Sequence, residues 1–349
     1  MKILHLLNSN KFSGAENVVC QIASMFDGDE NIEIIYCSPD GPIQSALNER
    51  GIQFFPLKRM KRKELMRAIE CVKPDVIHAH DMRASFFAAT VCGKIPLISH
   101  IHNNNFNSRR LTIRSIAYFY AALKAKHIIW VSQSSYEGYL FHKRFSNKSS
   151  ILYNIINPVE LRKKIGEDDQ TYSIDVIYVG RLALPKNPYR LLEISKLLIE
   201  KKPDIKIAVV GSGNMEEEIR KKSIEDGLSN NVHFWGFNPN PAKMLHDSKL
   251  MIMTSFREGT PMCALEAMAL GVPIVSTPVD GVKNLVVNDW NGFLSDDNIE
   301  LVDKIIEYLN DAQKLNYLRK NQVIQSEKWN SVENYKKTLL NIYYDERRN

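Results

Sequence analysis

The sequence predicts an α/β protein with two doubly wound parallel sheets, one in each half of the chain. Short runs rich in apolar and β-branched residues alternate with helix-length segments, which is typical of parallel strands joined by helices. The series restarts after the polar, charged stretch 163–173. We therefore expect two Rossmann-like domains facing each other across a cleft, with ligands bound beyond the carboxyl ends of the strands.

Seven strand-like runs precede the restart and five follow it. The first series is KILHLLN, IEIIYCS, QFFPL, DVIHAH, PLISHI, HIIWVS and SSILYN, and the second is IDVIYVG, IKIAVVG, VHFWG, LMIMTS and VPIVST. We place the domain boundary near Ile165, which gives domains over residues 1–165 and 166–330. The remaining residues, 331–349, predict a helix that packs back on the first domain.

Length and composition fit a globular protein of two domains. The chain has 349 residues, of which 44% are hydrophobic and 25% charged, and these values exclude a largely disordered chain. The net charge of +6 is modest, and we expect no nucleic-acid partner. The five cysteines have no close metal-ligand spacing, so free thiols in a reducing cytoplasm fit best.

The sequence shows no sign of export or of a membrane span. The start, MKILHLLNSN, enters a strand pattern directly and does not resemble a signal peptide. No stretch approaches the roughly 18 to 20 apolar residues that span a bilayer. We expect a cytoplasmic protein. The basic run KRMKRK at residues 58–63 is either a solvated loop or a peripheral contact with anionic lipid at the inner face of the membrane.

Two glutamates, Glu258 and Glu266, flank the start of a predicted helix in SFREGTPMCALEAMALGVPIV. Gly259 lets the backbone approach a ligand, Pro261 suits the first helical turn, and the amides there carry about half a positive charge. We expect an anion at this helix start. Glu258 lies just outside the helix and Glu266 on its second turn, so both can bind hydroxyl groups. The segment predicts a site for a phosphorylated sugar.

Two cations follow the strand IDVIYVG, in the segment RLALPKN. Arg181 can bind phosphate oxygens in a bidentate manner, and Lys186 supplies a point charge. Together they can neutralise a diphosphate without a metal. The pattern is weak by itself, because arginine and lysine after a strand are ordinarily surface residues. Its combination with the Glu258 segment makes it specific.

Two further features concern a helix start and a strand end. Gly14, in the segment SGAE, opens a helix directly after the first strand, which suits an anion or a sugar ring. A plain turn explains this glycine equally well. In VHFWGFN, Gly236 and Phe237 follow a strand, and backbone groups there can pair with the edge of a base.

Four histidines lie at or near predicted strand ends. His78 and His80 belong to DVIHAHD, and His100 and His102 belong to ISHIHNN. Side chains two residues apart share a face of a strand. Four histidines can ligate zinc, but no carboxylate or thiol pattern accompanies them beyond Asp81, so we expect no metal.

On these motifs the chain resembles the retaining family 4 glycosyltransferases of the GT-B fold. The resemblance rests on SGAE, VGRLALPKN, EGTPMCALEAMALGVPIV and GVKNLVVNDWNGFLS, in the family's order and at about its spacing. It covers nearly the whole chain. It implies transfer of a sugar from a nucleotide donor with retained anomeric configuration, and a donor held mainly by the second domain.

The resemblance also implies roles for individual residues. Arg181 and Lys186 would bind the diphosphate, and Glu266 the ribose. Glu258 would orient the donor sugar and phosphate together with the segment that follows it, namely Gly259, Thr260 and the amides of Pro261, Met262 and Cys263.

In the first domain, the resemblance implies that Gly14 lies near the donor phosphate or the acceptor. It implies that His102 faces the cleft as a catalytic group and hydrogen-bonds the donor sugar, with Asn103 and Asn104 beside it. His80 would shape the acceptor pocket. A structural histidine satisfied by backbone groups remains an alternative for His102, and also for His78 and His100.

The sequence therefore predicts a retaining, metal-independent hexosyltransferase without a cofactor. We expect a UDP-sugar as donor and a glycan or polyprenyl-linked glycan as acceptor, in the synthesis of a bacterial capsule or lipopolysaccharide. In a front-face route the leaving diphosphate takes the acceptor's proton; a covalent intermediate on Glu258 is the competing mechanism. A nucleotide-sugar 2-epimerase of similar fold and a non-catalytic nucleotide-sugar-binding partner subunit are the alternative functions.

Overall fold

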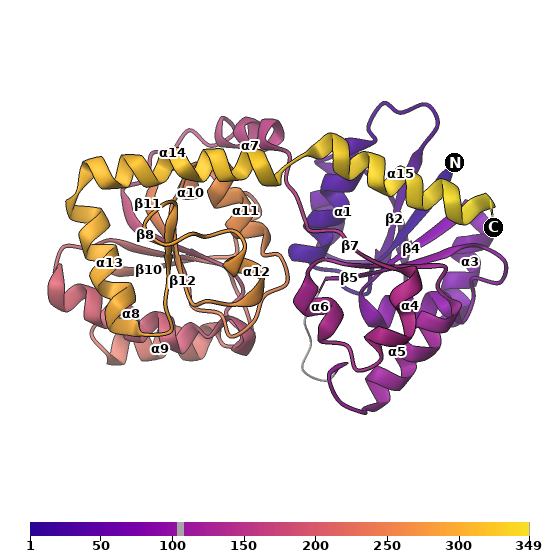
Figure 1. Ribbon diagram of the computed structural model, residues 1–349, viewed down its shortest axis with the longest axis horizontal. Coiled ribbons are helices and arrows are strands. Elements are labelled where there is room, and N and C mark those ends of the chain that lie inside the picture. Colours follow the sequence, from indigo (N-terminus) through magenta and orange to yellow (C-terminus); the bar gives the residue numbers. More distant parts are fainter. Residues whose placement is uncertain (103–107, 349) are drawn as a thin grey trace. The chain divides into compact units, whose positions relative to one another are not determined.

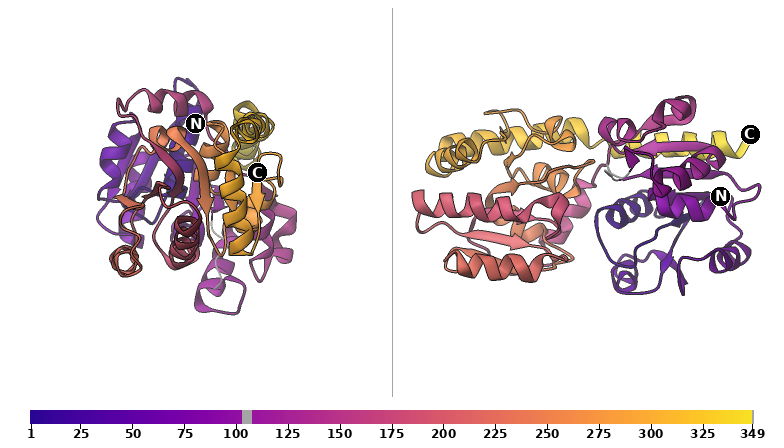
Figure 2. Two further views of the ribbon diagram at one scale, coloured as in Figure 1. Left: turned by 90° about the vertical axis from the view of Figure 1, so that its left-hand side faces the viewer. Right: turned by 90° about the horizontal axis from the view of Figure 1, so that it is seen from below.

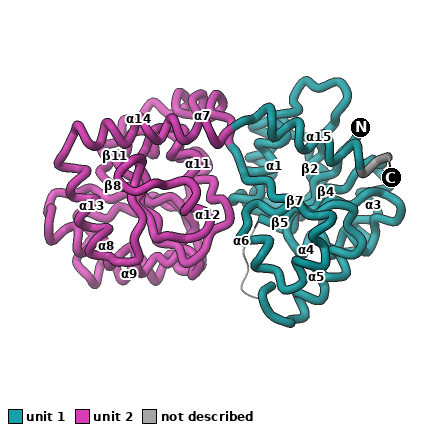
Figure 3. The backbone as a smooth tube through the Cα atoms, in the orientation of Figure 1, with its two compact units in different colours: residues 1–155, 331–349 teal, residues 156–330 magenta. Residues whose placement is uncertain are grey.

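The computed structural model describes residues 1–102 and 108–348 (Figure 1). The chain divides into two compact units, which Figure 3 colours separately. Unit 1 comprises residues 1–155 and 331–349, and unit 2 comprises residues 156–330. Each unit contains one parallel β-sheet between two layers of helices (Figure 2).

The sheet of unit 1 has seven parallel strands in the order β3-β2-β1-β4-β5-β6-β7. All seven predicted runs form strands. Their bounds are β1 (Lys2–Leu6), β2 (Glu33–Pro39), β3 (Gln53–Leu57), β4 (Val76–His80), β5 (Leu97–Ile101), β6 (His127–Trp130) and β7 (Ser149–Ile151).

The described helices of unit 1 cover both faces of this sheet. They are α1 (Gly14–Met25), α2 (Ile43–Asn48), α3 (Arg62–Val72), α4 (Asp81–Ala89), α5 (Ile113–Lys124), α6 (Gln133–Glu137), the 3-10 helix η2 (His142–Lys148) and α15 (Val332–Arg348).

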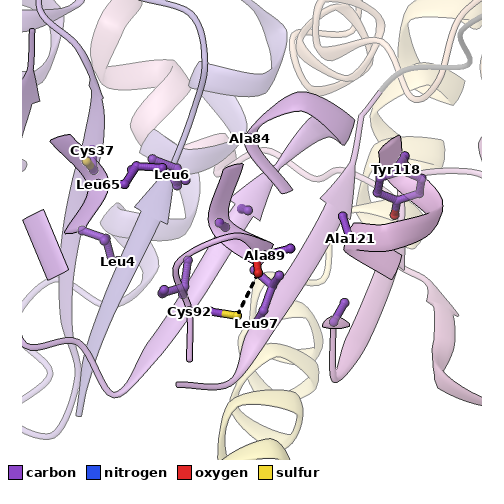
Figure 4. Packing of buried hydrophobic residues seen from close by; sticks show 14 of the residues in the cluster. Leu4, Leu6, Cys37, Leu65, Ala84, Ala89, Cys92, Leu97, Tyr118 and Ala121 are labelled. Carbon is purple, nitrogen blue, oxygen red and sulfur yellow. Dashed lines mark hydrogen bonds between the residues drawn. The ribbon is translucent and has the colours of Figure 1, made fainter. Parts of the chain in front are cut away.

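The two faces of the first sheet differ in chemistry. α3, α4 and α5 pack on an apolar face that includes Leu4, Leu6 and Leu97 (Figure 4). α1 and α15 lie on the opposite face, where the Tyr343 ring of α15 contacts the His78 ring of β4 and the end of α1 at Phe26. The C-terminal helix α15 is therefore part of unit 1.

The sheet of unit 2 has six parallel strands in the order β10-β9-β8-β11-β12-β13. Their bounds are β8 (Ile174–Val179), β9 (Ile207–Val210), β10 (Val232–Gly236), β11 (Ser248–Met253), β12 (Ile274–Ser276) and β13 (Gly292–Leu294). Five of these were predicted. The strand β13 was missed because its three residues follow a turn rich in Asn and Asp and offer no alternating pattern.

The helices of unit 2 form two layers. α8, α9 and α13 pack on one face, and α10, α11 and α14 lie on the other, as Figure 1 shows. The bounds are α7 (Pro158–Ile165), the 3-10 helix η3 (Leu184–Lys186), α8 (Pro188–Lys201), α9 (Glu216–Glu225), α10 (Ala242–Asp247), α11 (Met262–Ala269), α12 (Asp280–Lys283), α13 (Asn298–Asn310) and α14 (Ala312–Trp329).

The chain passes from unit 1 to unit 2 between Ile155 and Ile156, earlier than the boundary predicted near Ile165. The reason is α7, which packs against α10 and α11 and so belongs to unit 2. Asn157 begins this helix by accepting hydrogen bonds from two first-turn amides. The predicted boundary falls at the end of α7, where the polar stretch begins.

None of the described helices has both the length and the apolar character needed to cross a membrane. All five cysteines are free thiols, of which Cys71 is exposed.

Candidate active site

The candidate donor site of unit 2 lies at one edge of its sheet. In a parallel sheet the carboxyl ends of all strands share an edge, so the loops that follow them gather there. The loop after β8 carries Arg181 and Lys186, and the loop after β11 carries Glu258 and leads into α11. The structure thus brings together motifs that lie more than seventy residues apart.

A partly buried ion pair joins these two loops. The Lys186 Nζ donates to the Glu258 Oε1 at 2.5 Å, and the Lys186 and Glu258 side chains are 19% and 9% exposed. The Ser255 hydroxyl donates to the same oxygen at 2.5 Å. An ammonium group has three donors, so Lys186 can bind Glu258 and still donate to a phosphate.

Burial disfavours a charge on Lys186, but the Glu258 carboxylate outweighs this effect and raises the pKa of Lys186 above its ordinary value. The lysine therefore stays cationic at neutral pH. Burial, reinforced by the nearby carboxylates, raises the pKa of Cys263 to about 12 despite the lysine. Cys263 is therefore a protonated thiol and a poor nucleophile.

Further hydrogen bonds fix the two loops to each other. The Thr254 hydroxyl, at the end of β11, contacts the carbonyl oxygens of Lys186 and Asn187 at 3.0 Å each. The Phe256 N–H donates to the Pro185 oxygen at 2.9 Å. The position of Lys186 relative to Glu258 therefore depends on several contacts besides the ion pair.

Three glycines to which the sequence analysis gave no packing role allow close packing around these loops. A Cβ on Gly211 or Gly213 would lie 1.9 or 2.1 Å from a carbonyl oxygen of the loop after β8. A Cβ on Gly281, in α12, would lie 1.5 Å from the Gly259 oxygen and 3.2 Å from the Glu258 Cβ. Real side chains cannot occupy these spaces. The GSG triplet directly after the strand IKIAVV was the signal for the first two.

The start of α11 fits an anion, with one correction to the expected donors. Pro261 is the N-cap residue of α11 and has no N–H, so it cannot donate, contrary to the prediction. The amides of Met262 and Cys263 occupy the first turn, where helical N–H groups have no partner within the helix. α11 has no acidic residue in its first turn, so its positive end is not compensated there.

The other predicted residues of unit 2 lie near this edge. Glu266 is half-buried on the second turn of α11, Arg181 is exposed directly after β8, and Thr260 is buried. Phe237 follows the edge strand β10 and is 54% exposed, with Gly236 in the left-handed region at φ 71°. Of the two aromatics before it, Trp235 is exposed and Phe234 packs on the core, because side chains alternate along a strand.

In unit 1, Gly14 is the first residue of α1, after the extended N-cap Ser13. A Cβ at Gly14 would meet no atom within 4 Å, so local packing does not require a glycine. The Ser13 hydroxyl donates to the buried carboxylate of Glu16 at 2.5 Å. This helix start therefore carries a carboxylate of its own, unlike that of α11.

Five buried histidines form a layer on the α1 and α15 face of the first sheet. His5 pairs in register with His78, and His80 pairs with His100. Because residues two apart share a face, the same face also includes His102. The sequence analysis singled out four of them and missed His5. The only signal for His5 was its place in the predicted strand KILHLLN, which pairs with the strand of DVIHAH.

These rings form two hydrogen-bonded chains. In the first, the His80 Nε2 contacts the His5 Nδ1 at 2.9 Å and its Nδ1 contacts the His102 Nε2 at 2.8 Å. In the second, His78 contacts the Tyr343 hydroxyl at 2.8 Å and the His100 Nδ1 at 3.2 Å. The partners are side chains, not the backbone groups that the structural alternative assumed.

The histidine layer is uncharged at neutral pH. Burial, with repulsion between neighbouring rings for four of the five, lowers every pKa. The pKa values of His5 and His102 fall to about 3. Each neutral ring offers one N–H and one acceptor, which matches the alternating contacts of the chains.

His102 and His80 have different positions from each other. His102 directly follows β5, its backbone N–H donates to the Asp81 Oδ1 at 3.0 Å, and its Nδ1 has no partner among the described residues. His80 is 2% exposed and both ring nitrogens contact histidines. His80 therefore has no free ring nitrogen to bind an acceptor directly and contacts His102 instead; a role in shaping the acceptor pocket stays a prediction. Asn103 and Asn104 lie outside the described residues.

The histidine layer also contains two sets of three ring nitrogens that lie within 4.8 Å of one another: His5, His78 and His80, and His80, His100 and His102. These rings already contact each other through hydrogen bonds, so a metal ion would have to replace those bonds. The absence of a metal cofactor stays a prediction.

Two family models match the chain in succession. The model for Glycosyltransferase Family 4 matches residues 12–160, and the model for Glycosyl transferases group 1 matches residues 160–323. The chain is a family 4 glycosyltransferase. The glycosyltransferase resembles MJ1059, an uncharacterised glycosyltransferase of Methanocaldococcus jannaschii, with 28% identity over 64% of this chain and 60% of that protein.

Two further proteins resemble this glycosyltransferase along most of its length. An Escherichia coli UDP-Gal:alpha-D-GlcNAc-diphosphoundecaprenol alpha-1,3-galactosyltransferase is 25% identical over 92% of this chain and 91% of its own. The crystal structure of Anabaena Alr3699/HepE in complex with UDP-glucose superimposes with a TM-score of 0.85, at 21% identity, over 99% of this chain and 100% of that one. The structural match confirms the two-domain GT-B fold.

Proposed function

We propose that this glycosyltransferase moves a sugar from a UDP-sugar to a lipid-linked glycan, with retention of the anomeric configuration. The observation that carries the proposal is the partly buried pair of Lys186 and Glu258 beside the α11 helix start. A cation, a carboxylate and helical amides at one place suit a ligand that contains both a diphosphate and a sugar.

The proposed roles follow from where each group lies. Lys186, Arg181 and the amides of Met262 and Cys263 stabilise the charge that develops on the leaving diphosphate. Glu258, fixed by Lys186 and Ser255, accepts hydrogen bonds from sugar hydroxyls. Since these groups are held in place before the donor binds, little reorganisation is needed during transfer.

A front-face route uses only these groups. The bond from the anomeric carbon to the diphosphate oxygen breaks as the acceptor oxygen forms its bond on the same face. The acceptor's proton passes to the leaving oxygen, so no protein base or nucleophile is needed. Glu258 is already engaged by Lys186 and Ser255, which favours orientation of the sugar over a covalent role.

The choice of donor and acceptor rests on the relatives. The similar Anabaena protein was solved with UDP-glucose, and the similar E. coli enzyme uses UDP-Gal and a diphosphoundecaprenol-linked acceptor. We infer the same classes of donor and acceptor here, with synthesis of a surface polysaccharide as the process.

A thermal-shift experiment tests the donor site. UDP-, GDP- and ADP-sugars are added to the wild type and to Lys186→Met, with and without EDTA. We expect a UDP-sugar to raise the Tm by several degrees, independently of EDTA, and Lys186→Met to abolish this rise. Stabilisation by a GDP- or ADP-sugar instead, or an intact response in the variant, would contradict the proposal.

The chain offers a matched control for this variant. Lys243 pairs with Asp247 at 2.7 Å, and their side chains are 18% and 10% exposed, nearly as buried as the Lys186 pair. Asp247 directly precedes β11, at the opposite edge of the sheet. Lys243→Met should lower the Tm but keep the response to the donor.

A second experiment measures transfer to a polyprenyl-linked acceptor and follows the anomeric proton of the product by NMR. It separates a retaining transferase from an epimerase or a non-catalytic subunit.

A further inference from the structure

The outer face of α5 in unit 1 is unusually apolar. Four of its residues follow one another at helical spacing and are exposed to solvent: Ile113 by 88%, Ile116 by 53%, Tyr120 by 40% and Leu123 by 53%. Leu111, just before the helix, is 70% exposed. These five residues, the α5 outer face, form a row along one side of the helix. Contiguous exposed apolar patches usually mark an interaction site.

The fold of unit 1 explains why this row faces outward. Thr112 and Ser115 cap α5 reciprocally: the Ser115 N–H donates to the Thr112 Oγ1 at 3.1 Å and the Thr112 N–H to the Ser115 Oγ at 2.8 Å. The opposite side of the helix carries Tyr118 and Ala121, both in the buried core (Figure 4). Tyr118 also hydrogen-bonds Ser99 of β5 at 3.0 Å. The core thus fixes the rotation of α5 about its axis.

The charge around the α5 outer face is strongly positive. Residues 108–148 contain eight lysines and arginines and one acidic residue, Glu137, whereas the net charge of the whole chain is only +6. Arg114 and Lys124, on α5 itself, are exposed. Apolar residues flanked by exposed cations are typical of helices that lie in the interface of a bilayer with anionic lipids.

A neighbouring loop extends the same surface. The Leu140 N–H donates to the Ser108 oxygen at 2.9 Å, which holds this loop beside the start of the α5 segment. Leu140 is itself 42% exposed, and Lys143 and Arg144, just after it, are also exposed. Two segments that are separate in sequence therefore present the same combination of apolar and basic side chains.

We propose that the α5 outer face docks unit 1 on an anionic bilayer, with its apolar side chains inserted and its cations at the lipid headgroups. The partner of this face is a membrane and not a protein, because cations, and not mixed charges, border the row of apolar residues. This assigns membrane contact to a surface other than the KRMKRK run. In that run the exposed cations surround Met60, which is buried, so its own methionine cannot insert.

Vesicle flotation with the full chain tests the proposal. Vesicles of phosphatidylcholine alone are compared with vesicles that also contain phosphatidylglycerol. We expect the wild type to bind only the anionic vesicles, and the double variant Ile113→Ser/Ile116→Ser to bind at least roughly a hundredfold more weakly, since each lost apolar side chain removes about tenfold. Arg114→Gln/Lys124→Gln should weaken binding severalfold, most clearly at low salt.

Two controls make the result specific. Ile224→Ser changes an isoleucine of α9 that is 69% exposed and is followed by Glu225 and Asp226, and it should leave flotation unchanged. Lys61→Gln/Arg62→Gln/Lys63→Gln alters the KRMKRK run and should reduce binding less than the isoleucine variant does. Circular dichroism confirms that each variant is folded.

Three outcomes would overturn the proposal. The first is flotation of the isoleucine variant like that of the wild type. The second is a larger loss in the KRMKRK variant than in the isoleucine variant. The third is a dimeric wild type that does not bind vesicles and becomes monomeric in the isoleucine variant, which would make the face a contact between two copies. Flotation requires no sugar transfer, so this inference can fail or hold independently of the proposed function.

Discussion

The two units share a strand order but fill the same face of the sheet with different chemistry. The order β3-β2-β1-β4-β5-β6 in unit 1 corresponds to β10-β9-β8-β11-β12-β13 in unit 2. The helix after the first strand, α1 or α8, covers the equivalent face. In unit 1 this face carries five imidazoles. In unit 2 it carries apolar side chains, among them Val176, Leu250, Ile252 and Val275.

This difference shows that one topology supports two kinds of core. Unit 2 buries apolar groups between its strands and helices, and its Lys186–Glu258 pair lies in the loops at the carboxyl edge of the sheet. Unit 1 instead buries titratable rings that hydrogen-bond one another and Tyr343. The stability of unit 1 therefore depends on the protonation of buried histidines. The described residues of unit 2 include no buried histidine.

The largest predicted effect is the loss of unit 1 on mild acidification. A histidine with a pKa near 6.5 when unfolded and about 3 when folded binds a proton more readily in the unfolded state. The contribution of each such histidine to the free energy of unfolding is therefore fully present above pH 6.5 and is lost as the pH drops toward 3. At pH 5 each such histidine lowers the free energy of unfolding by about 2 kcal/mol. Hydrogen exchange should show β4 and β5 losing protection before β8 and β11.

Substitutions sharpen this comparison. His5→Leu should reduce the slope of unfolding free energy against pH between 6.5 and 5 by one proton, or about 1.4 kcal/mol per pH unit. His233→Ala, which replaces an exposed histidine of unit 2, is the matched control. If the stability of unit 1 stays constant from pH 7 to pH 5, the description of a neutral histidine layer is wrong.

The next largest effect concerns the loop that carries Glu258. In Gly281→Ala the new methyl group would lie 1.5 Å from the Gly259 oxygen, so the loop must move and the Lys186–Glu258 contact must lengthen. A displacement of about 1 Å at a site of this kind costs roughly a hundredfold in activity. Steady-state transfer kinetics measure this loss. Gly166→Ala, whose Cβ would lie 3.4 Å from its nearest neighbour, the Lys163 oxygen, at a φ of −72°, controls for replacing a glycine of unit 2 elsewhere. Full activity in Gly281→Ala would contradict the steric argument.

A smaller effect is expected for the glutamate on the second turn of α11. Glu266→Ala should weaken donor use by roughly tenfold to a hundredfold, because one hydrogen bond to a charged group is lost. The change should appear in the KM for the donor and not in the KM for the acceptor. Glu266→Gln keeps the shape of the side chain and should recover part of the loss. Unchanged kinetics in the alanine variant would remove Glu266 from the donor site.

The sequence was sufficient where local patterns decide the structure. Alternating strand and helix patterns predicted both sheets, and the approach of Lys186 to Glu258 followed from the shared carboxyl edge of parallel strands. What it could not predict depends on contacts between distant segments. His5 joins the histidine layer only through its register with His78, and Tyr343 joins through the return of α15. The need for glycine at position 281 arises from a carbonyl oxygen more than twenty residues away.

The smallest structural effect is expected at the glycine that opens α1. Gly14→Ala adds a methyl group that meets no atom within 4 Å, at a helical position where alanine is favourable, so the Tm should be unchanged or slightly higher. If Gly14 lies close to the donor phosphate or the acceptor, the KM of that substrate should nevertheless rise severalfold. Gly14 and Gly281 then represent opposite cases: one glycine leaves room for a ligand, and the other for a neighbouring loop. An unchanged Tm together with unchanged KM values for both substrates would reduce Gly14 to a plain turn residue.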